Sequence, residues 1–298
     1  MKVLHLEHPE DMILEGDLSV FDALYGTANI SLKIDGAPAI VYGTNPENGK
    51  FFVGTKSVFN KKKKMICYTV EDIFNLYNEE THSSLIEVLV MCLMYLPKVD
   101  GIIQGDFIGF GGSNVYRPNT LTYTFTEIIS QKIIIAPHTK YNLKGAGNTL
   151  LHTVASPLVT TFTNTDDVKY VQPTVDRVFH CKDVPNINTD RVTFLTAKEA
   201  KIAKKAINTL IREDIELDDA NLYDILQCNH LVNLYQIVRD IKIDLMDSFI
   251  VTDAPKCYND GIEIVGEGFV MQTKYGTIKL VDREEFAYAN FNNGKFQK

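Results

Sequence analysis

The sequence predicts an α+β protein, and three observations predict it. Short runs rich in β-branched and aromatic residues occupy the first 60 positions and return between 267 and 281. Residues 70–96 and 196–249 instead carry apolar residues at the helical spacing i, i+3, i+4. Gly, Pro and Asn separate the strand-like runs. Together these patterns predict sheets with helices packed outside them.

Each expected element has a local signature. Strands are expected at 28–33, 38–43, 50–55, 100–112, 120–129, 267–273 and 276–281. Thr196 and Glu199 form a capping box, which predicts a helix that begins there. The apolar face of that helix would consist of Ala203, Ala206, Ile207, Leu210 and Ile211. Residues 137–190, rich in Asn and Thr, are expected to form loops and short strands.

Composition indicates a soluble globular protein. The chain has 298 residues, 45% of them hydrophobic, which suffices for one large domain or two ordinary ones. Its first residues lack the apolar core of a signal peptide. The longest apolar stretch, 84–97, is interrupted by Glu87 and is too short to span a bilayer. We therefore expect no membrane partner.

Cysteine usage indicates a cellular location, and the net charge argues against one class of nucleic-acid-binding protein. Five cysteines, at positions 67, 92, 181, 228 and 257, are scattered and form no CxxC pair. This pattern argues against a disulfide framework or a zinc site and favours a cytoplasmic location, the host cytoplasm if the gene belongs to a phage. The net charge of −8 argues against a sequence-independent DNA coat, but not against an enzyme that touches nucleic acid locally.

The stretch 31–43, SLKIDGAPAIVYG, places one lysine inside an apolar, strand-like run. Asp35-Gly36 between two apolar runs is a strong hairpin signal, so an outward-pointing Lys33 beside a β-turn is one interpretation. The other interpretation gives Lys33 a chemical role and depends on further segments. In chain order these are GTKS at 54–57, IIQGDFIGFG at 102–111, YTF at 123–125, EGFV at 267–270 and TIKL at 277–280.

Together these segments supply the groups for nucleotide transfer. A neutral lysine can attack the α-phosphate of a nucleotide, and apolar surroundings with nearby cations favour the neutral form. Carboxylates can hold a metal ion, an aromatic ring can stack on the base, and further lysines can neutralise phosphate charge. The ordered set resembles the covalent nucleotidyltransferase superfamily of ATP-dependent DNA and RNA ligases and mRNA capping enzymes. Within it, the chain is most similar to phage-type ATP-dependent RNA ligases.

The resemblance covers both ends of the chain and implies one adenylation domain over residues 1–298. The implied nucleotidyltransferase fold, ATP-grasp-like, has two antiparallel sheets flanking a nucleotide cleft. Residues 196–249 would be a helical insert within it. Only 19 residues follow Lys279, too few for a C-terminal OB-fold, and this favours RNA ends over DNA ends.

The resemblance implies a role for each residue of the first two motifs. Lys33 would be the nucleophile that forms lysyl-AMP. Asp35 would orient that amine or help to hold metal, and Gly36 would permit a close turn beneath the nucleotide. Lys56 would join the nucleotide-binding set. Turn formation is the alternative for Asp35 and Gly36.

The later motifs supply the remaining groups. Asp106 takes the acidic place of the third motif, more often Glu in ligases, and would meet the ribose or the metal; a turn aspartate is the alternative. Phe125 would stack on the base, with Tyr123 or a core role as alternatives. Glu267 would bind Mg²⁺ directly or through its waters, and Lys279 would stabilise the α-phosphate.

The sequence departs from the family pattern at two positions. Thr277 stands where the fifth motif usually has its first lysine, so Lys274 or Lys56 could supply the missing charge. Pro38 stands where many DNA ligases have an arginine. The second departure, like the short segment after Lys279, favours an RNA ligase.

The implied activity is ATP-dependent ligation of RNA. AMP from ATP would pass to the lysine, then to a 5′-phosphate end, and a 3′-hydroxyl would expel it, with Mg²⁺ or Mn²⁺ as the metal. One alternative is a DNA ligase or a GTP-using capping-type transferase. Another is a degenerate, non-catalytic module that binds nucleotide or RNA, which Thr277 and the negative net charge favour.

Three charged segments, at 5–11, 61–64 and 198–205, lie outside these motifs. Lys198, Lys201 and Lys205 share one face of the helix that begins at 196, where they would bind RNA phosphates; a solvated face is the alternative. The four lysines at 61–64 are the next candidate. The segment HLEHPED at 5–11 contains histidines and carboxylates like a metal site, but without a defined ligand spacing. We expect it to have a surface or structural role. The alternative is contact between Glu7 and the base of the nucleotide.

Overall fold

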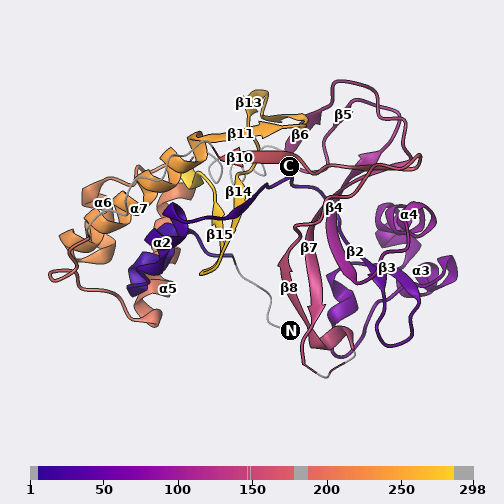
Figure 1. Ribbon diagram of the computed structural model, residues 1–298, viewed down its shortest axis with the longest axis horizontal. Coiled ribbons are helices and arrows are strands. Elements are labelled where there is room, and N and C mark those ends of the chain that lie inside the picture. The colour runs from indigo at the N-terminus through magenta and orange to yellow at the C-terminus, as the bar shows by residue number, and fades with distance from the viewer. Residues whose placement is uncertain (1–5, 146, 148, 178–186, 285–298) are drawn as a thin grey trace. The chain divides into compact units, whose positions relative to one another are not determined.

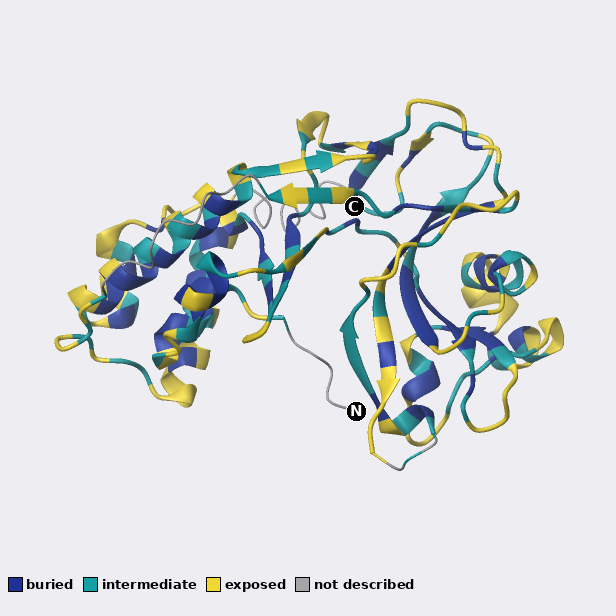
Figure 2. Ribbon diagram, in the orientation of Figure 1, coloured by how far each residue is buried: buried dark blue, intermediate teal, exposed yellow. Residues whose placement is uncertain are grey.

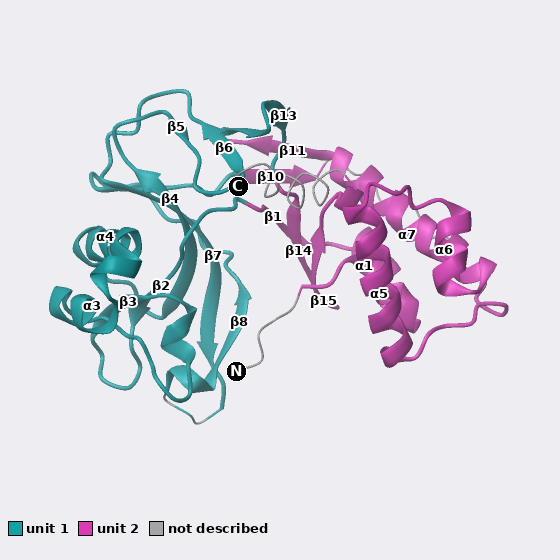
Figure 3. Ribbon diagram, turned by 180° about the vertical axis from the view of Figure 1, so that it is seen from behind, with its two compact units in different colours: residues 1–5, 34–173, 253–266 teal, residues 6–33, 174–252, 267–298 magenta. Residues whose placement is uncertain are grey.

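The computed structural model describes residues 6–145, 147, 149–177 and 187–284. These residues form two compact units, each with its own sheets and helices (Figures 1 and 3). Unit 1 contains Ile34–Pro173 and Asp253–Gly266. Unit 2 contains Leu6–Lys33, Thr174–Thr252 and the described residues from Glu267 onward. The expected α+β class with antiparallel sheets is confirmed.

Unit 1 is built around a sheet with the strand order β3-β2-β4-β7-β8, with β9 beside β7. The β7–β9 pair is parallel, and the other pairs are antiparallel. A second sheet has the order β13-β12-β6-β5. The strands are β2 (Ala39–Thr44), β3 (Phe51–Gly54), β4 (Ile102–Phe110), β5 (Val115–Tyr116), β6 (Leu121–Thr124), β7 (Ile133–Leu143), β8 (Thr153–Pro157), β9 (Val168–Tyr170), β12 (Lys256–Asn259) and β13 (Ile262–Ile264). The helices are η2 (Lys56–Phe59), α3 (Val70–Leu76), α4 (Glu79–Tyr95) and η3 (Leu150–His152).

The larger sheet of unit 1 is covered on both faces. Ile40 and Tyr42 of β2 pack in one cluster with Leu89 of α4. Val41, which points to the other face, packs in a second cluster with Tyr141 of β7. Burial on both faces explains why 38–43 reads as a continuous apolar run rather than an alternating one (Figure 2).

Strand β7 corrects one expectation. Ile133–Leu143 is an eleven-residue strand in the interior of the sheet, although residues from 137 onward were expected to form loops and short strands. Its first half is apolar and its second half polar, and Pro137 interrupts the pattern. Proline cannot donate a ladder hydrogen bond, so it occurs within sheets mainly at edges and bulges. A bulge is present here, because Gln104 pairs with Thr139 but Gly105 pairs with Pro137.

Unit 2 combines small sheets with five α-helices in its described part. One sheet has the order β1-β14-β15, and β10 pairs with β11. The strands are β1 (Asn29–Leu32), β10 (Thr174–Arg177), β11 (Phe249–Thr252), β14 (Phe269–Thr273) and β15 (Gly276–Leu280). The helices are α1 (Pro9–Met12), η1 (Ile13–Glu15), α2 (Ser19–Tyr25), α5 (Ala197–Arg212), α6 (Asp219–Leu226) and α7 (Asn229–Asp247).

The helix expected after Thr196 is confirmed as α5. Its capping box is complete, since the Thr196 hydroxyl accepts from the Glu199 amide and the Glu199 carboxylate accepts from the Thr196 amide. Ala203, Ile207 and Ile211 are buried as expected, whereas Ala206 and Leu210 are half-buried.

The structure also bears on the expected number of sheets and on the helices expected at 196–249. The described strands are distributed over four sheets rather than two, because β1 and β2, adjacent in sequence, join different sheets. The helices expected as an insert at 196–249 belong to unit 2, where α7 contacts α1 and α2. A single adenylation domain stays a prediction. Over the described positions, no helix combines the length and apolar character that crossing a bilayer requires.

Candidate functional site

Lys33, Glu267 and Lys279 come together at one sheet of unit 2. Lys33 directly follows β1, and its amide donates to the Gly268 carbonyl at 2.8 Å. Its ammonium forms an ion pair with the Glu267 carboxylate. Through β14, the register aligns Ser31 with Lys279. Because side chains alternate along a strand, Lys279 lies on the same face of the sheet as Ser31 and Lys33.

The electrostatics of this group suit an anionic ligand. The Lys33 side chain is 33% exposed and that of Glu267 is 19% exposed, so both remain accessible. Burial, and then the nearby cations Arg283 and Lys33, lower the pKa of Lys279. Two lysines face one carboxylate in this group, which leaves an excess of positive charge for a phosphate.

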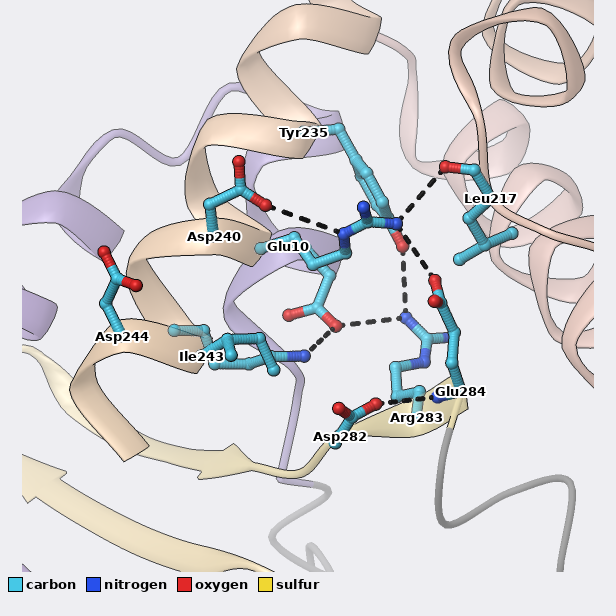
Figure 4. Close-up of a pocket in the computed structure, with 11 residues that line it drawn as sticks. Glu10, Leu217, Tyr235, Asp240, Ile243, Asp244, Asp282, Arg283 and Glu284 are labelled. Carbon is cyan, nitrogen blue, oxygen red and sulfur yellow. Dashed lines mark hydrogen bonds and ion pairs between the residues drawn. The ribbon is translucent and has the colours of Figure 1, made fainter. Parts of the chain in front are cut away.

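A buried ionic cluster supports the chain just beyond Lys279. Lys242 of α7 donates to Glu10 and to the Val281 carbonyl, both at 2.9 Å. Arg283 donates to Asp11 at 2.8 Å and lies 3.6 Å from Glu10. Figure 4 places Glu10 and Arg283 at a cavity of about 450 Å³. Glu10, Lys242 and Arg283 are each at most 6% exposed, so this cluster fixes α1 and α7 to the segment after β15.

This cluster gives the segment 5–11 a structural role, as far as it is described. Glu10 pairs with Lys242 and Asp11 pairs with Arg283 in the interior of unit 2. His5 lies outside the described residues. Glu7 is exposed; its carbonyl accepts from the Lys279 amide at 3.1 Å, and its carboxylate pairs with Lys204 at 2.6 Å. Contact between Glu7 and a base stays a prediction.

The structure describes Thr277, which departs from the family pattern, and the two lysines that could supply the missing charge. Thr277 is half-buried on the same face of β15 as Lys279. Lys274 is exposed in the β14–β15 turn, with its ammonium 4.8 Å from the centre of the Tyr275 ring. Lys56 is exposed at the first position of η2 in unit 1.

In unit 1, Asp35-Gly36 forms a connection rather than a hairpin. The hairpin interpretation is wrong, because β1 pairs with β14 whereas β2 pairs with β3 and β4. The Asp35 amide donates to the Tyr123 hydroxyl at 2.8 Å, and the Asp35 carboxylate accepts from Asn119. A Cβ on Gly36 would lie 2.5 Å from the Phe107 carbonyl oxygen, so this close approach to β4 requires glycine.

Asp106 and the two aromatic candidates have different environments. Asp106 lies within β4, with its side chain 14% exposed, rather than in a turn. Phe125 follows β6, is half-buried and meets the Tyr116 ring edge-on at 5.7 Å between centres. Tyr123 is fully buried, so its ring has no face open to a base, and this alternative is contradicted.

The candidate residues thus fall into two groups. Lys33, Glu267 and Lys279 belong to unit 2. The unit 1 group contains Asp35, Gly36, Lys56, Asp106 and Phe125. Sequence reasoning missed the neighbours of Asp106 on β4 and β7 as well as the ionic cluster. For the neighbours of Asp106, the available signal was Pro137 inside a strand-like run. No local pattern marks the ionic cluster.

The basic face of α5 is present on the surface. Lys198, Lys201 and Lys205 are exposed and form no ion pair with any residue that the structure describes. Lys204, between them in sequence, is half-buried and pairs with Glu7 and Glu15. Of the lysines at 61–64, the first three are exposed and the fourth pairs with Glu47.

The structure also describes four of the five cysteines and the side chains that could hold a metal ion. Cys67, Cys92 and Cys257 are buried thiols, Cys228 is partly exposed, and Cys181 lies outside the described residues. Within the described ranges, no three His, Cys, Asp or Glu side chains are grouped to hold a metal ion. A site formed by one or two carboxylates and the phosphates of a nucleotide is the usual arrangement for Mg²⁺.

Comparison with known proteins gives one match. No curated protein and no solved structure matches the chain significantly. One family model matches residues 4–225 and 224–295, which together span nearly the whole sequence. The chain therefore belongs to the family described as "Family of unknown function (DUF6267)".

Proposed function

We propose that this chain is a covalent nucleotidyltransferase that works as an ATP-dependent RNA ligase. One observation carries the proposal: Lys33, Glu267 and Lys279, which are far apart in sequence, meet at one three-stranded sheet. A nucleophilic amine, a carboxylate and a second cation are the groups that attack on an α-phosphate requires.

The first step is transfer of AMP to Lys33. The neutral Lys33 amine attacks the α-phosphorus of ATP, the bond from that phosphorus to the bridging oxygen breaks, and pyrophosphate leaves. The Glu267 carboxylate, which pairs with the Lys33 ammonium, first takes the proton whose loss makes the amine neutral. The departing pyrophosphate takes the proton that the nitrogen loses after the attack. Lys279 stabilises negative charge as it develops on the α-phosphate. The product is lysyl-AMP.

The carboxylates proposed as Mg²⁺ ligands are Glu267 and Asp106. One Glu267 oxygen pairs with Lys33, and the other has no hydrogen-bond partner among the described residues. Asp106 offers a partly exposed carboxylate. Oxygen ligands of this kind suit Mg²⁺, which would neutralise phosphate charge. Variants of Glu267 and of Asp106 test the contribution of each carboxylate separately.

The later steps use a nucleic-acid end. AMP passes from Lys33 to a 5′-phosphate, and a 3′-hydroxyl then attacks that phosphate and expels AMP. The exposed lysines of α5 support RNA as the polymer, because unpaired cations on a chain of net charge −8 form a local site for phosphates.

The test is covalent labelling with α-labelled ATP and Mg²⁺, read on denatured protein. Wild-type protein should carry label that GTP does not compete away, whereas Lys33→Ala should carry none. Lys33→Arg should also fail, because a guanidinium stays protonated. The matched control is Lys256→Ala, which removes a lysine that also pairs with a glutamate on a strand but lies 62% exposed in unit 1.

The outcomes separate the alternatives. Label on Lys33→Ala at the wild-type rate would show that another residue is the nucleophile. Wild-type protein that binds ATP without taking up label would be a non-catalytic module. Transfer from labelled protein to 5′-phosphorylated RNA but not to DNA would complete the assignment to an RNA ligase.

A further inference from the structure

Helices α3 and α4 of unit 1 carry an acidic surface. Residues 65–97 contain five carboxylates and neither lysine nor arginine, so this segment contributes −5 to the net charge of −8. Glu71, Glu79, Glu80 and Glu87 are exposed and form no ion pair within the part of the chain that the structure describes. Unpaired charges of one sign attract partners of the other sign.

The same surface contains an apolar groove between the two helices. Phe74 of α3 lines this groove with Val90 and Met91 of α4, and its volume is about 310 Å³. Phe74 is 49% exposed, and the exposed Glu79 and Glu87 also line the groove. An amphipathic helix docks by laying apolar side chains into such a groove, and the carboxylates favour a helix that carries lysines. The same carboxylates repel the phosphates of a nucleic acid.

Helix α5 of unit 2 has a complementary surface. Ile202 is 61% exposed, the largest exposed fraction of any large apolar side chain on the described helices. Lys198 lies four residues before Ile202 and Lys205 three residues after it, so both are its neighbours on the helix surface. Both lysines are exposed and form no ion pair with a described residue. One apolar side chain thus lies between two free cations.

We infer that α5 of one copy of this chain docks in the α3–α4 groove of a second copy. Ile202 enters the groove beside Phe74, while the lysines of α5 meet the carboxylates of Glu79 and Glu87. The docking requires apolar contact and opposite charge together, and these two surfaces supply both.

The form of the assembly follows from the position of the two surfaces. They are different patches and belong to different units (Figure 3), so the contact is head-to-tail and builds rings or open chains. One helix face buries less area than a standard interface, so the association is weak and depends on concentration and salt. The inference does not rest on the proposed ligase activity. RNA bound to the lysines of α5 would compete with the second copy.

Sedimentation velocity of the full chain over a range of concentrations tests the inference. Wild-type protein should associate as its concentration rises, and added NaCl should weaken the association. Ile202→Ser and Phe74→Ser should each raise the dissociation constant at least about tenfold, because each removes the apolar contact. Ile262→Ser is the matched control, since Ile262 of β13 is 69% exposed but belongs to neither surface.

Two charge-reversed variants give a sharper test. Glu79→Lys/Glu87→Lys makes the groove basic, and Lys198→Glu/Lys205→Glu makes α5 acidic, so neither variant should associate alone. An equimolar mixture of the two should associate, because each α5 then meets a groove of opposite charge on the other variant.

The controls for charge make equal changes elsewhere. Asp219→Lys/Asp224→Lys and Lys61→Glu/Lys62→Glu alter exposed residues outside both surfaces, and each should associate like the wild type.

Three results would overturn the inference: wild-type protein that stays monomeric at every concentration, a mixture no more associated than its two components, or equal losses in Ile202→Ser and Ile262→Ser. All the substituted side chains are exposed, so the variants should keep the wild-type circular dichroism spectrum. Lysyl-AMP labelling is read separately, so each proposal can fail without the other.

Discussion

Removing Lys242 should destabilise the protein strongly, although this residue lies in none of the sequence motifs. Its ammonium is 2% exposed and has two partners at 2.9 Å, the Glu10 carboxylate and the Val281 carbonyl. Lys242→Met would leave Glu10, itself 1% exposed, with Arg283 at 3.6 Å and with one carboxylate oxygen that already has no hydrogen-bond partner among the described residues. Removing one partner of a buried ion pair costs about 3–5 kcal/mol.

The assay is urea unfolding followed by far-ultraviolet circular dichroism. Lys242→Met should lower the free energy of unfolding by about 3–5 kcal/mol. The double variant Glu10→Gln/Lys242→Met should recover much of that loss, because the uncompensated buried charge is then gone and the amide can still accept from Arg283.

An exposed ion pair provides the contrast. Lys256 and Glu263 lie 3.2 Å apart with side chains 62% and 53% exposed, so Lys256→Met should cost at most about 1 kcal/mol. Equal losses in Lys242→Met and Lys256→Met would refute the reasoning from burial. A double variant less stable than Lys242→Met alone would show that the cost does not come from the unpaired Glu10 carboxylate.

Three further predictions concern the site and its surroundings. Glu267→Ala and Asp106→Ala should each slow lysyl-AMP formation by roughly 10²–10³, the cost of one preorganised group, and a wild-type single-turnover rate would remove that residue from the mechanism. Tyr123→Phe should cost about 1–3 kcal/mol in urea unfolding, because it leaves the Asp35 amide without its partner at 2.8 Å; no change would mean that water replaces the hydroxyl. Lys198→Glu/Lys201→Glu/Lys205→Glu should weaken RNA binding and lower its salt slope by about 2, from three lost phosphate contacts. The equal charge change Lys61→Glu/Lys62→Glu/Lys63→Glu is its control, and the reverse ranking would move the RNA site to the tetralysine loop.

Local sequence determined most of the elements. The predicted helices at 70–96 and 196–249 correspond to α3 to α7, because capping residues and apolar periodicity act within one or two helical turns. The expected strands at 28–33, 38–43, 267–273 and 276–281 are present for a similar reason, since side-chain alternation and turn residues are also local. The motif order further predicted that Lys33 and Lys279 would share a site, and they lie on one sheet.

Only the tertiary structure decided which strands pair and what surrounds each charge. Asp35-Gly36 has the sequence of a hairpin turn, yet β1 and β2 join different sheets, because β1 pairs with β14 and β2 pairs with β4, both far away along the chain. Phe125 was the preferred stacking residue and Tyr123 the alternative, and only burial of Tyr123 separates them by environment. The approach of Lys242 to Glu10 joins positions 232 residues apart, and the bulge at His138 depends on the register between β4 and β7. These contacts arise from packing between distant segments, whose free energy no local pattern of residues records.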